Sequence, residues 1–228
     1  MAPNHITTAC TRPRTRRLSC SSIVWAAGDA GRSARARGLA VCQSRLCAKL
    51  QTMKTLYVVR HCKAEGQEAD APLTPEGVAQ SNSLADSLAT TNIERIISSP
   101  YIRATQSIAP LAARLNLAVE LDIRLVERVL CSGARPDWQE RLCASFSDLD
   151  LSFEGGESSR KAMQRAVAVV TEIQRHSAQS TLLVTHGNLM ALLLKHFDDS
   201  IGFAEWCALS NPDVYRVVLT LPFSIQRL

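Results

Sequence analysis

The feature that most constrains this chain is a short apolar run that ends in an arginine and a histidine. Residues 56–59 combine leucine with aromatic and β-branched side chains, which is typical of a buried strand, and Arg60 and His61 follow directly. The stretch 181–187 has the same shape and places His186 after its apolar run. Both runs deliver side chains that suit phosphate, so we predict that the two strand ends meet around one phosphoryl group.

Segments with the composition of strands alternate with helical segments through residues 53–228. This alternation predicts an α/β fold, a three-layer sandwich with a mostly parallel central sheet. Ligands of such sheets bind beyond the carboxyl ends of the strands, which is where Arg60, His61 and His186 fall. The predicted strands are residues 55–59, 93–97, 117–121, 181–185 and 214–221. The predicted helices follow Thr74, Pro100, Trp138 and Gly156 and include residues 189–194.

Three of these helix starts carry sequence signals. Thr74 suits the N-cap position and Pro75 the first helical position. Residues 98–100 (Ser-Ser-Pro) repeat the arrangement of a capping residue before a proline. Ser158 follows the glycine pair at 155–156, and we interpret it as a helix cap rather than as a catalytic serine.

The first 52 residues differ from the rest in charge. They hold nine Lys or Arg and one acid, a net charge of +8, whereas residues 53–228 hold 17 basic and 20 acidic residues, a net charge of −3. We expect residues 1–52, the leader, to be disordered. We interpret the leader as an upstream extension with Met53 as the true start; an organellar transit peptide and a nucleic-acid arm are the alternatives. Because the basic charge is confined to the leader, nucleic acid is not a predicted partner.

Cysteine usage and hydropathy constrain the compartment. The eight cysteines form no C-x-x-C pair and no zinc spacing, and the four after residue 53 are spread out, which suits reduced thiols in a cytoplasm. No apolar run reaches the roughly 18 residues that a membrane span needs. The sequence therefore predicts a cytoplasmic protein with no membrane partner, or an organellar one if the leader is a transit peptide. It predicts no particular oligomeric state.

Four basic or imidazole side chains have the chemistry that phosphoryl transfer requires. Without a metal, such a transfer needs a nucleophile, fixed positive charge around the oxygens and an acid for the leaving group. His61 can be the nucleophile through one ring nitrogen if the other donates to a carbonyl or carboxylate. Arg60 and Arg103 offer planar forks of donors that fit phosphate oxygens. His186 precedes a helix start, where free N–H groups also favour an anion.

The acid and a further donor are assigned to two other residues. Glu127 is the candidate proton donor, and Glu120, Asp122 and Glu154 are alternatives in the neighbouring sequence. The competing interpretation of Glu127 is a surface salt bridge to a nearby arginine. Gln67 can add a neutral donor to phosphate, or be an ordinary loop residue.

These residues stand in motifs that resemble those of the histidine phosphatase superfamily, the phosphoglycerate mutase-like proteins, over about residues 54–221. Arg60-His61 is similar to the family's Arg-His-Gly signature, whose histidine is the phosphorylated nucleophile. Residues 99–104 look like its Ser-Pro-x-x-Arg-Ala element, whose arginine, here Arg103, binds phosphate. The likeness is to the small phosphatase branch, and it implies a phosphoglycerate mutase-like fold and a reaction that uses no metal or cofactor.

Three further elements follow in the family's order. Residues 125–128 resemble the segment that supplies the acid, residues 155–158 resemble its Gly-Glu-Ser element, and residues 184–187 resemble the element with the second histidine. Gln67 falls where the family often places a phosphate-contacting Asn or Gln. Cys62 departs from the signature because it replaces the customary glycine; we expect a backbone without positive φ there, so that a small side chain is tolerated.

The resemblance and the residues together predict a metal-independent phosphomonoester hydrolase that acts on a small phosphorylated substrate through a phosphohistidine. A phosphoglycerate mutase-type transferase is the alternative, and a non-catalytic phospho-ligand-binding module is a third. A mutase must exclude water with longer covering segments, and here residues 128–156 alone provide cover within the predicted domain, 53–228. Substrate specificity is expected from that insertion, where Arg128, Arg135, Trp138 and Arg141 could meet the leaving group.

Overall fold

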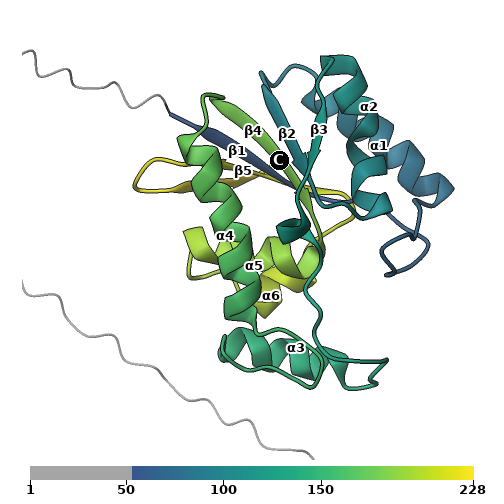
Figure 1. Cartoon of the computed structure of the whole chain (residues 1–228), viewed down its shortest axis with the longest axis vertical. Coiled ribbons are helices and arrows are strands. Elements are labelled where there is room, and N and C mark those ends of the chain that lie inside the picture. The colour runs from purple at the N-terminus through teal and green to yellow at the C-terminus, as the bar shows by residue number, and fades with distance from the viewer. Residues whose placement is uncertain (1–52) are drawn as a thin grey trace, which may run out of the picture. The chain divides into compact units, whose positions relative to one another are not determined.

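The computed structural model describes residues 53–228, so the predictions for the leader lie outside the described residues. Within this range, strands assemble into one sheet in the order β3-β2-β4-β1-β5-β6 (Figure 1). Neighbouring strands are parallel from β3 to β1, whereas β5 is antiparallel to β1 and β6 to β5. The prediction of an α/β fold with a mostly parallel sheet is therefore confirmed. The strands are β1 (Thr55–Arg60), β2 (Arg95–Ser98), β3 (Val119–Leu121), β4 (Ser180–Thr185), β5 (Asp213–Val218) and β6 (Ser224–Arg227).

Helices cover both faces of this sheet and make it the middle of three layers. Helices α1 (Pro75–Leu88) and α2 (Ile102–Leu115) lie on one side, and α4 (Ser159–Arg175) and α5 (Gly187–Phe197) lie on the other (Figure 1). Successive residues of a strand point to opposite faces. Tyr57 and Val59 of β1 accordingly belong to the apolar cluster under α1 and α2, and Leu56 and Val58 belong to the cluster under α4 and α5.

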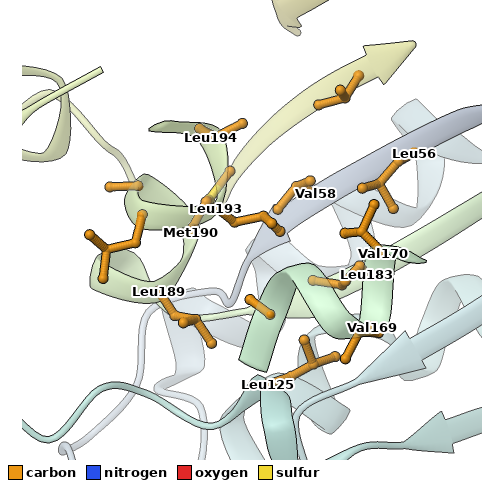
Figure 2. Close-up of a cluster of buried hydrophobic side chains, with 14 of the residues drawn as sticks. Leu56, Val58, Leu125, Val169, Val170, Leu183, Leu189, Met190, Leu193 and Leu194 are labelled. Carbon is orange, nitrogen blue, oxygen red and sulfur yellow. The ribbon is translucent and has the colours of Figure 1, made fainter. Parts of the chain in front are cut away.

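The second cluster holds the helix that follows the strand β4. Figure 2 shows Val169 and Val170 of α4 together with Leu189, Met190 and further leucines of α5, packed over the sheet. Residues 187–194 of α5 are all buried, as the apolar run at 189–194 predicts. The start of α5 is thereby held firmly beside the carboxyl ends of β1 and β4.

Smaller elements lie beyond the sheet on the α5 side. They are the 3-10 turn η1 (Ile123–Leu125), α3 (Trp138–Ser147) and α6 (Phe203–Cys207). Helix α6 contacts both α5 and α3. Helix α3 also packs on the core directly, because its Leu142 and Phe146 belong to the same apolar cluster as α4 and α5. The sequence predicts α3 but gives no signal for the five-residue α6.

Two of the three predicted helix caps are present. Thr74 Oγ1 accepts a hydrogen bond from the Gly77 N–H at 2.9 Å, and Ser158 Oγ accepts one from the Lys161 N–H at 3.3 Å. The prediction of a capping serine before Pro100 is wrong. Helix α2 starts two residues later, at Ile102, and its N-cap Tyr101 makes no side-chain capping bond. The serine hydroxyls at this turn serve other partners, one of them in the site described below.

Two properties bear on the environment of the chain. The four cysteines of the described part are free. Among the helices of residues 53–228, none is both long enough and apolar enough to cross a membrane.

Candidate active site

The two predicted strand ends lie side by side. Strands β1 and β4 are adjacent and parallel, and their register pairs Arg60 with Thr185, so His61 and His186 follow at the same edge of the sheet. The two imidazole rings stand edge to face with centroids 5.1 Å apart. The His61 N–H donates to the Thr185 carbonyl at 3.1 Å, which extends the ladder to the histidine itself.

The contacts of His61 fix its tautomer. Its Nδ1 lies 2.7 Å from the Cys62 carbonyl oxygen, which can only accept, so Nδ1 carries the proton. Its Nε2 therefore presents a lone pair, and the Arg103 Nε donates to it at 3.3 Å. The pKa of His61 is lowered to about 4, chiefly by burial and also by the charges of Arg103 and Arg60, although the Cys62 hydrogen bond acts in the opposite direction. His61 is thus a neutral imidazole at ordinary pH, with Nε2 unprotonated.

Arg103 approaches His61 from the helix layer that contains α1 and α2. It lies on the first turn of α2 and is 1% exposed. Its Nη1 donates to the Glu68 carbonyl at 2.6 Å, and its guanidinium stands 4.8 Å from the centre of the Tyr101 ring. Burial lowers the pKa of Arg103, while the charge of Glu127 opposes that shift. No salt bridge to a carboxylate is formed by Arg103 in residues 53–228, so it is a buried cation available to an anion.

Arg60 supplies the second cation from the end of β1. Its Nη1 donates to the carbonyl oxygens of Leu209 and Ser210 at 3.1 and 3.2 Å. The guanidinium lies against Gly187, where an added Cβ would be 3.1 Å from the Arg60 Cζ, so a glycine there permits the close approach. Burial lowers the pKa of Arg60, and the charges of Glu127 and Asp213 oppose that shift.

His186 is held neutral beside His61. Its Nε2 lies 2.8 Å from the Ser99 Oγ, and its Nδ1 has no hydrogen-bond partner among the described residues. Burial lowers the pKa of His186 well below its ordinary value, and the charges of His61 and Arg103 act in the same direction. Buried polar atoms without a partner are rare, and this nitrogen, when it carries the ring proton, could donate to a phosphate oxygen.

Glu127 is the preferred candidate for the proton donor, and its side chain contacts the first turn of α5. Its Oε1 accepts the N–H groups of Arg128 and Leu189 at 2.9 and 3.0 Å, and its Oε2 accepts that of Asn188 at 3.1 Å. The free N–H groups of the helix start after His186 are therefore occupied, because they donate to the side-chain carboxyl group of Glu127 of the chain itself. The surface salt bridge considered for Glu127 does not form within the described range.

The other three candidates for the proton donor either form salt bridges or do not line the site cavity. Glu120 pairs with Arg95 and Asp122 pairs with Arg124. Glu154 is exposed and does not line the cavity described next.

A cavity of about 460 Å³ opens beside these residues and contains both Arg60 and Glu127 in its wall. Gln67 is exposed and lies on its rim, and Arg128 and Trp138 of the predicted insertion also line it. Arg135 and Arg141 do not line it; Arg141 pairs with Asp137. A larger hollow of about 640 Å³ lies between α1 and the β5–β6 side and contains none of the predicted site residues.

Sequence reasoning missed four residues that support His61 and its neighbours. Ser107 accepts the Cys62 N–H at 2.8 Å, and Asn211 donates to the His61 carbonyl at 2.7 Å. Ser99 holds the ring of His186. Ser107 follows Arg103 by one helical turn, a spacing that could have placed both on one face of α2. Asn211 lies in the loop before β5, where nothing in its local sequence indicates the contact.

The fourth missed residue, Arg165 of α4, binds the segment that leads to Glu127. Its Nη1 donates to the carbonyl oxygens of Arg124 and Val126 at 2.5 and 2.8 Å, and its other nitrogens pair with Glu157. Arg165 therefore holds the backbone on which Glu127 stands.

Cys62 is accommodated as the sequence predicts. Among non-glycine residues of the described part, positive φ occurs at Asn116 and not at Cys62. The Cys62 side chain is fully buried in the cluster under α1 and α2. Its backbone carbonyl still faces His61, so the replacement of glycine leaves that contact intact.

The chain resembles known proteins both as a family member and in comparison with single relatives. A family model described as histidine phosphatase superfamily (branch 1) matches residues 56–220. The chain is similar to the uncharacterised protein Rv0525 of Mycobacterium tuberculosis (strain ATCC 25618 / H37Rv), with 39% identity over 79 residues. That match covers 32% of this chain and 39% of the relative, so the chain spans well under two thirds of the relative's length.

Solved structures of two phosphatases share the fold. A mycobacterial glucosyl-3-phosphoglycerate phosphatase in complex with inorganic phosphate is 25% identical, with a TM-score of 0.64, covering 77% of this chain and 95% of the other. A phosphoserine phosphatase mutant of Entamoeba histolytica in complex with phosphoserine is 19% identical, with a TM-score of 0.61, covering 76% and 95%. The first structure holds inorganic phosphate and the second phosphoserine, and the likeness of both proteins to this chain is one of fold.

Proposed function

Because the chain belongs to the histidine phosphatase superfamily, branch 1, we propose that it is a metal-independent phosphomonoester hydrolase that works through a phosphohistidine intermediate. The observation that carries the proposal is the tautomer of His61. The Nδ1–H donates to the Cys62 carbonyl, which leaves Nε2 unprotonated, with a lone pair that accepts a 3.3 Å hydrogen bond from the Arg103 Nε. A nucleophile of this kind needs no separate base to become reactive.

In the first half of the reaction, the His61 Nε2 attacks phosphorus in line with the ester oxygen. The N–P bond forms as the P–O ester bond breaks, and Glu127 gives a proton to the leaving oxygen. A carboxylate oxygen can accept two hydrogen bonds. The Glu127 Oε2 accepts only one within residues 53–228, from Asn188, so we assign the transferred proton to Oε2. Arg60, Arg103 and the His186 Nδ1, as an N–H, donate to the three phosphoryl oxygens, over which the charge of the transition state is spread.

In the second half, a water molecule attacks the phosphohistidine. Glu127 accepts a proton from the water as the new O–P bond forms, and the N–P bond breaks. Inorganic phosphate leaves, and His61 returns to its neutral form. The low pKa of His61 favours this step, because the imidazole departs without needing a second proton.

The cavity supports a small phosphorylated substrate covered by residues 128–156. Trp138 and Leu142 of α3 line the cavity together with Arg60. We propose that residues 53–228 are the catalytic domain, that 128–156 is its substrate-covering insertion and that Gln67 contacts the phosphate from the rim. The free cysteines suit a reducing compartment such as the cytoplasm.

The test is hydrolysis of para-nitrophenyl phosphate by the full-length chain in the presence of EDTA. We expect turnover that vanadate inhibits, since vanadate resembles the transferring phosphoryl group. His61→Ala should lower kcat at least about a thousandfold, as expected when a nucleophile is removed. His196→Ala is the matched control, because His196 is an exposed histidine of α5 outside the cavity.

Each outcome discriminates between mechanisms. No turnover by the unmutated chain would contradict the hydrolase, and turnover undiminished by His61→Ala would contradict the phosphohistidine. Transfer of phosphate to added 3-phosphoglycerate rather than to water would indicate the mutase-type transferase. A chain beginning at Met53 that folds and turns over normally would show that the leader has no part in catalysis.

A further inference from the structure

The cavity has a second wall that the phosphate chemistry does not use. Trp138 of α3 and Trp206 of α6 both line it, and their rings meet at 84° with centroids 6.0 Å apart. Two perpendicular indoles form a corner with one ring face and one ring edge. Trp138 is 43% exposed, so a large apolar surface is left open within reach of Arg60 and Glu127.

The corner is held in place by further aromatic contacts. Trp206 stacks on Phe203 with an interplanar angle of 22° and centroids 5.4 Å apart. Phe203 meets the buried Phe146 of α3 edge to face at 6.3 Å. The series of rings runs from α3 to α6 and back to α3, so the two tryptophans are presented by packed neighbours rather than by a loose loop. A preorganised apolar wall of this kind is the usual basis of ligand recognition.

A buried amide lies where the apolar wall meets the catalytic groups. Asn188 is 8% exposed and lines the same cavity, yet neither its Oδ1 nor its Nδ2 has a hydrogen-bond partner in the described part of the chain. Its backbone N–H is the donor to the Glu127 Oε2, which places the residue next to the proposed proton donor. Buried polar groups without partners are rare in folded proteins, and those in a cavity wall point to a ligand.

We infer that Trp138, Trp206 and Asn188 form a leaving-group subsite for an aromatic phosphomonoester that bears an amide-like or comparable polar substituent. This inference rests on the proposed hydrolase function. The flat ring packs into the corner of the two indoles, because offset-stacked and edge-to-face aromatic pairs are stabilised beyond the apolar area that they bury. The substituent supplies the acceptor and donor that the Asn188 amide lacks, and the ester oxygen then faces Glu127.

The first experiment measures binding without turnover. Full-length His61→Ala protein is titrated with phenylphosphonate, cyclohexylphosphonate and methylphosphonate, which cannot be hydrolysed, and tryptophan fluorescence is followed. We expect phenylphosphonate to bind about two- to tenfold more tightly than its cyclohexyl counterpart, as aromatic pairing implies. Equal affinities for these two compounds would overturn the aromatic subsite.

Variants then assign the effect to residues. Adding Trp138→Ala should reduce the preference for phenyl over methyl about tenfold, in line with the loss of one large aromatic contact. Val78→Ala is the control, because Val78 is an exposed apolar residue of α1 outside the cavity. Trp206→Phe, which keeps a ring, should retain most of the preference. A phenyl preference that survives Trp138→Ala unchanged would contradict the assignment.

Asn188 has its own readout. Either 3- or 4-carbamoylphenylphosphonate should bind more tightly than phenylphosphonate, and Asn188→Ala should abolish that gain. Absence of a gain with both isomers would remove Asn188 from the subsite. If the chain prefers phenylphosphonate but hydrolyses no phosphate ester, the proposed function is wrong and the subsite stands. If the chain hydrolyses aryl and alkyl phosphates but shows no preference for phenylphosphonate in binding, the subsite is wrong and the proposed function stands.

Discussion

The neutral state of His61 should make the folded protein sensitive to acid. In the folded chain the pKa of His61 is lowered to about 4, chiefly by burial. In the unfolded chain the same ring has a pKa of about 6.5. Between these values the unfolded state binds a proton that the folded state does not, so the free energy of unfolding falls as the pH is lowered from about 6.5 to about 4. Above about 6.5 both states are neutral and the full stability is present.

The size of the effect follows from the shift. A pKa difference of about 2.5 units between the two states corresponds to roughly 3 kcal/mol at about pH 4, once partial protonation of the folded state is included. The charges of Arg103 and Arg60 add to the shift, and His61 is 7% exposed, so solvent relieves little of the cost. His61→Asn removes the titrating ring. It should therefore reduce the stability difference between about pH 7.5 and about pH 4 by roughly 3 kcal/mol.

The assay is urea unfolding of the unmutated chain and of His61→Asn at a series of pH values. Ser107→Ala is the control, because it removes the hydroxyl that accepts the Cys62 N–H without removing a titrating group. It should lower stability at every pH by a similar amount and keep the pH dependence. The same pH dependence in His61→Asn as in the unmutated chain would refute the argument that His61 is held neutral by the fold.

Three further changes have expected outcomes. Thr74→Ala removes the cap of α1 and should lower the free energy of unfolding by about 1 kcal/mol, measured by urea denaturation. Arg165→Met frees the backbone before Glu127 and should lower kcat about tenfold or more for alkyl phosphates but less for para-nitrophenyl phosphate, which needs less help from an acid. The exposed Arg160→Met serves as its control on the same helix. Cys62→Gly empties a buried site and should cost about 1–2 kcal/mol in thermal or urea unfolding.

The part of the site that the sequence predicts is the part built by strand ends. Arg60, His61 and His186 each follow an apolar run, and parallel strands bring their carboxyl ends to one edge, so a local pattern and a topological rule suffice. Arg103 is found by its motif. The sequence does not predict that Arg103 is buried. Helix α2 also carries a charged residue on its exposed face, so an arginine on this helix could equally be a surface residue.

The part that the sequence does not predict depends on contacts between distant segments. Ser99 looks like a helix cap by its place before proline, yet its hydroxyl holds His186, because tertiary contacts override a local preference. Asn211 reaches the His61 carbonyl across 150 positions of the chain. The aromatic corner needs Trp206 on a five-residue helix, which is too short to show a hydrophobic period.

The residue that breaks the family signature explains what the signature requires at that position. Cys62 contributes its carbonyl oxygen to the Nδ1 of His61 and its N–H to Ser107, and both contacts belong to the backbone. Its side chain points instead into the cluster under α1 and α2, and its φ is not positive. The ring of His61 is therefore held by a backbone of fixed direction after it, and this does not require that the next residue lack a side chain. A buried thiol is compatible with this arrangement because its side chain packs in the core while its peptide groups hold the imidazole.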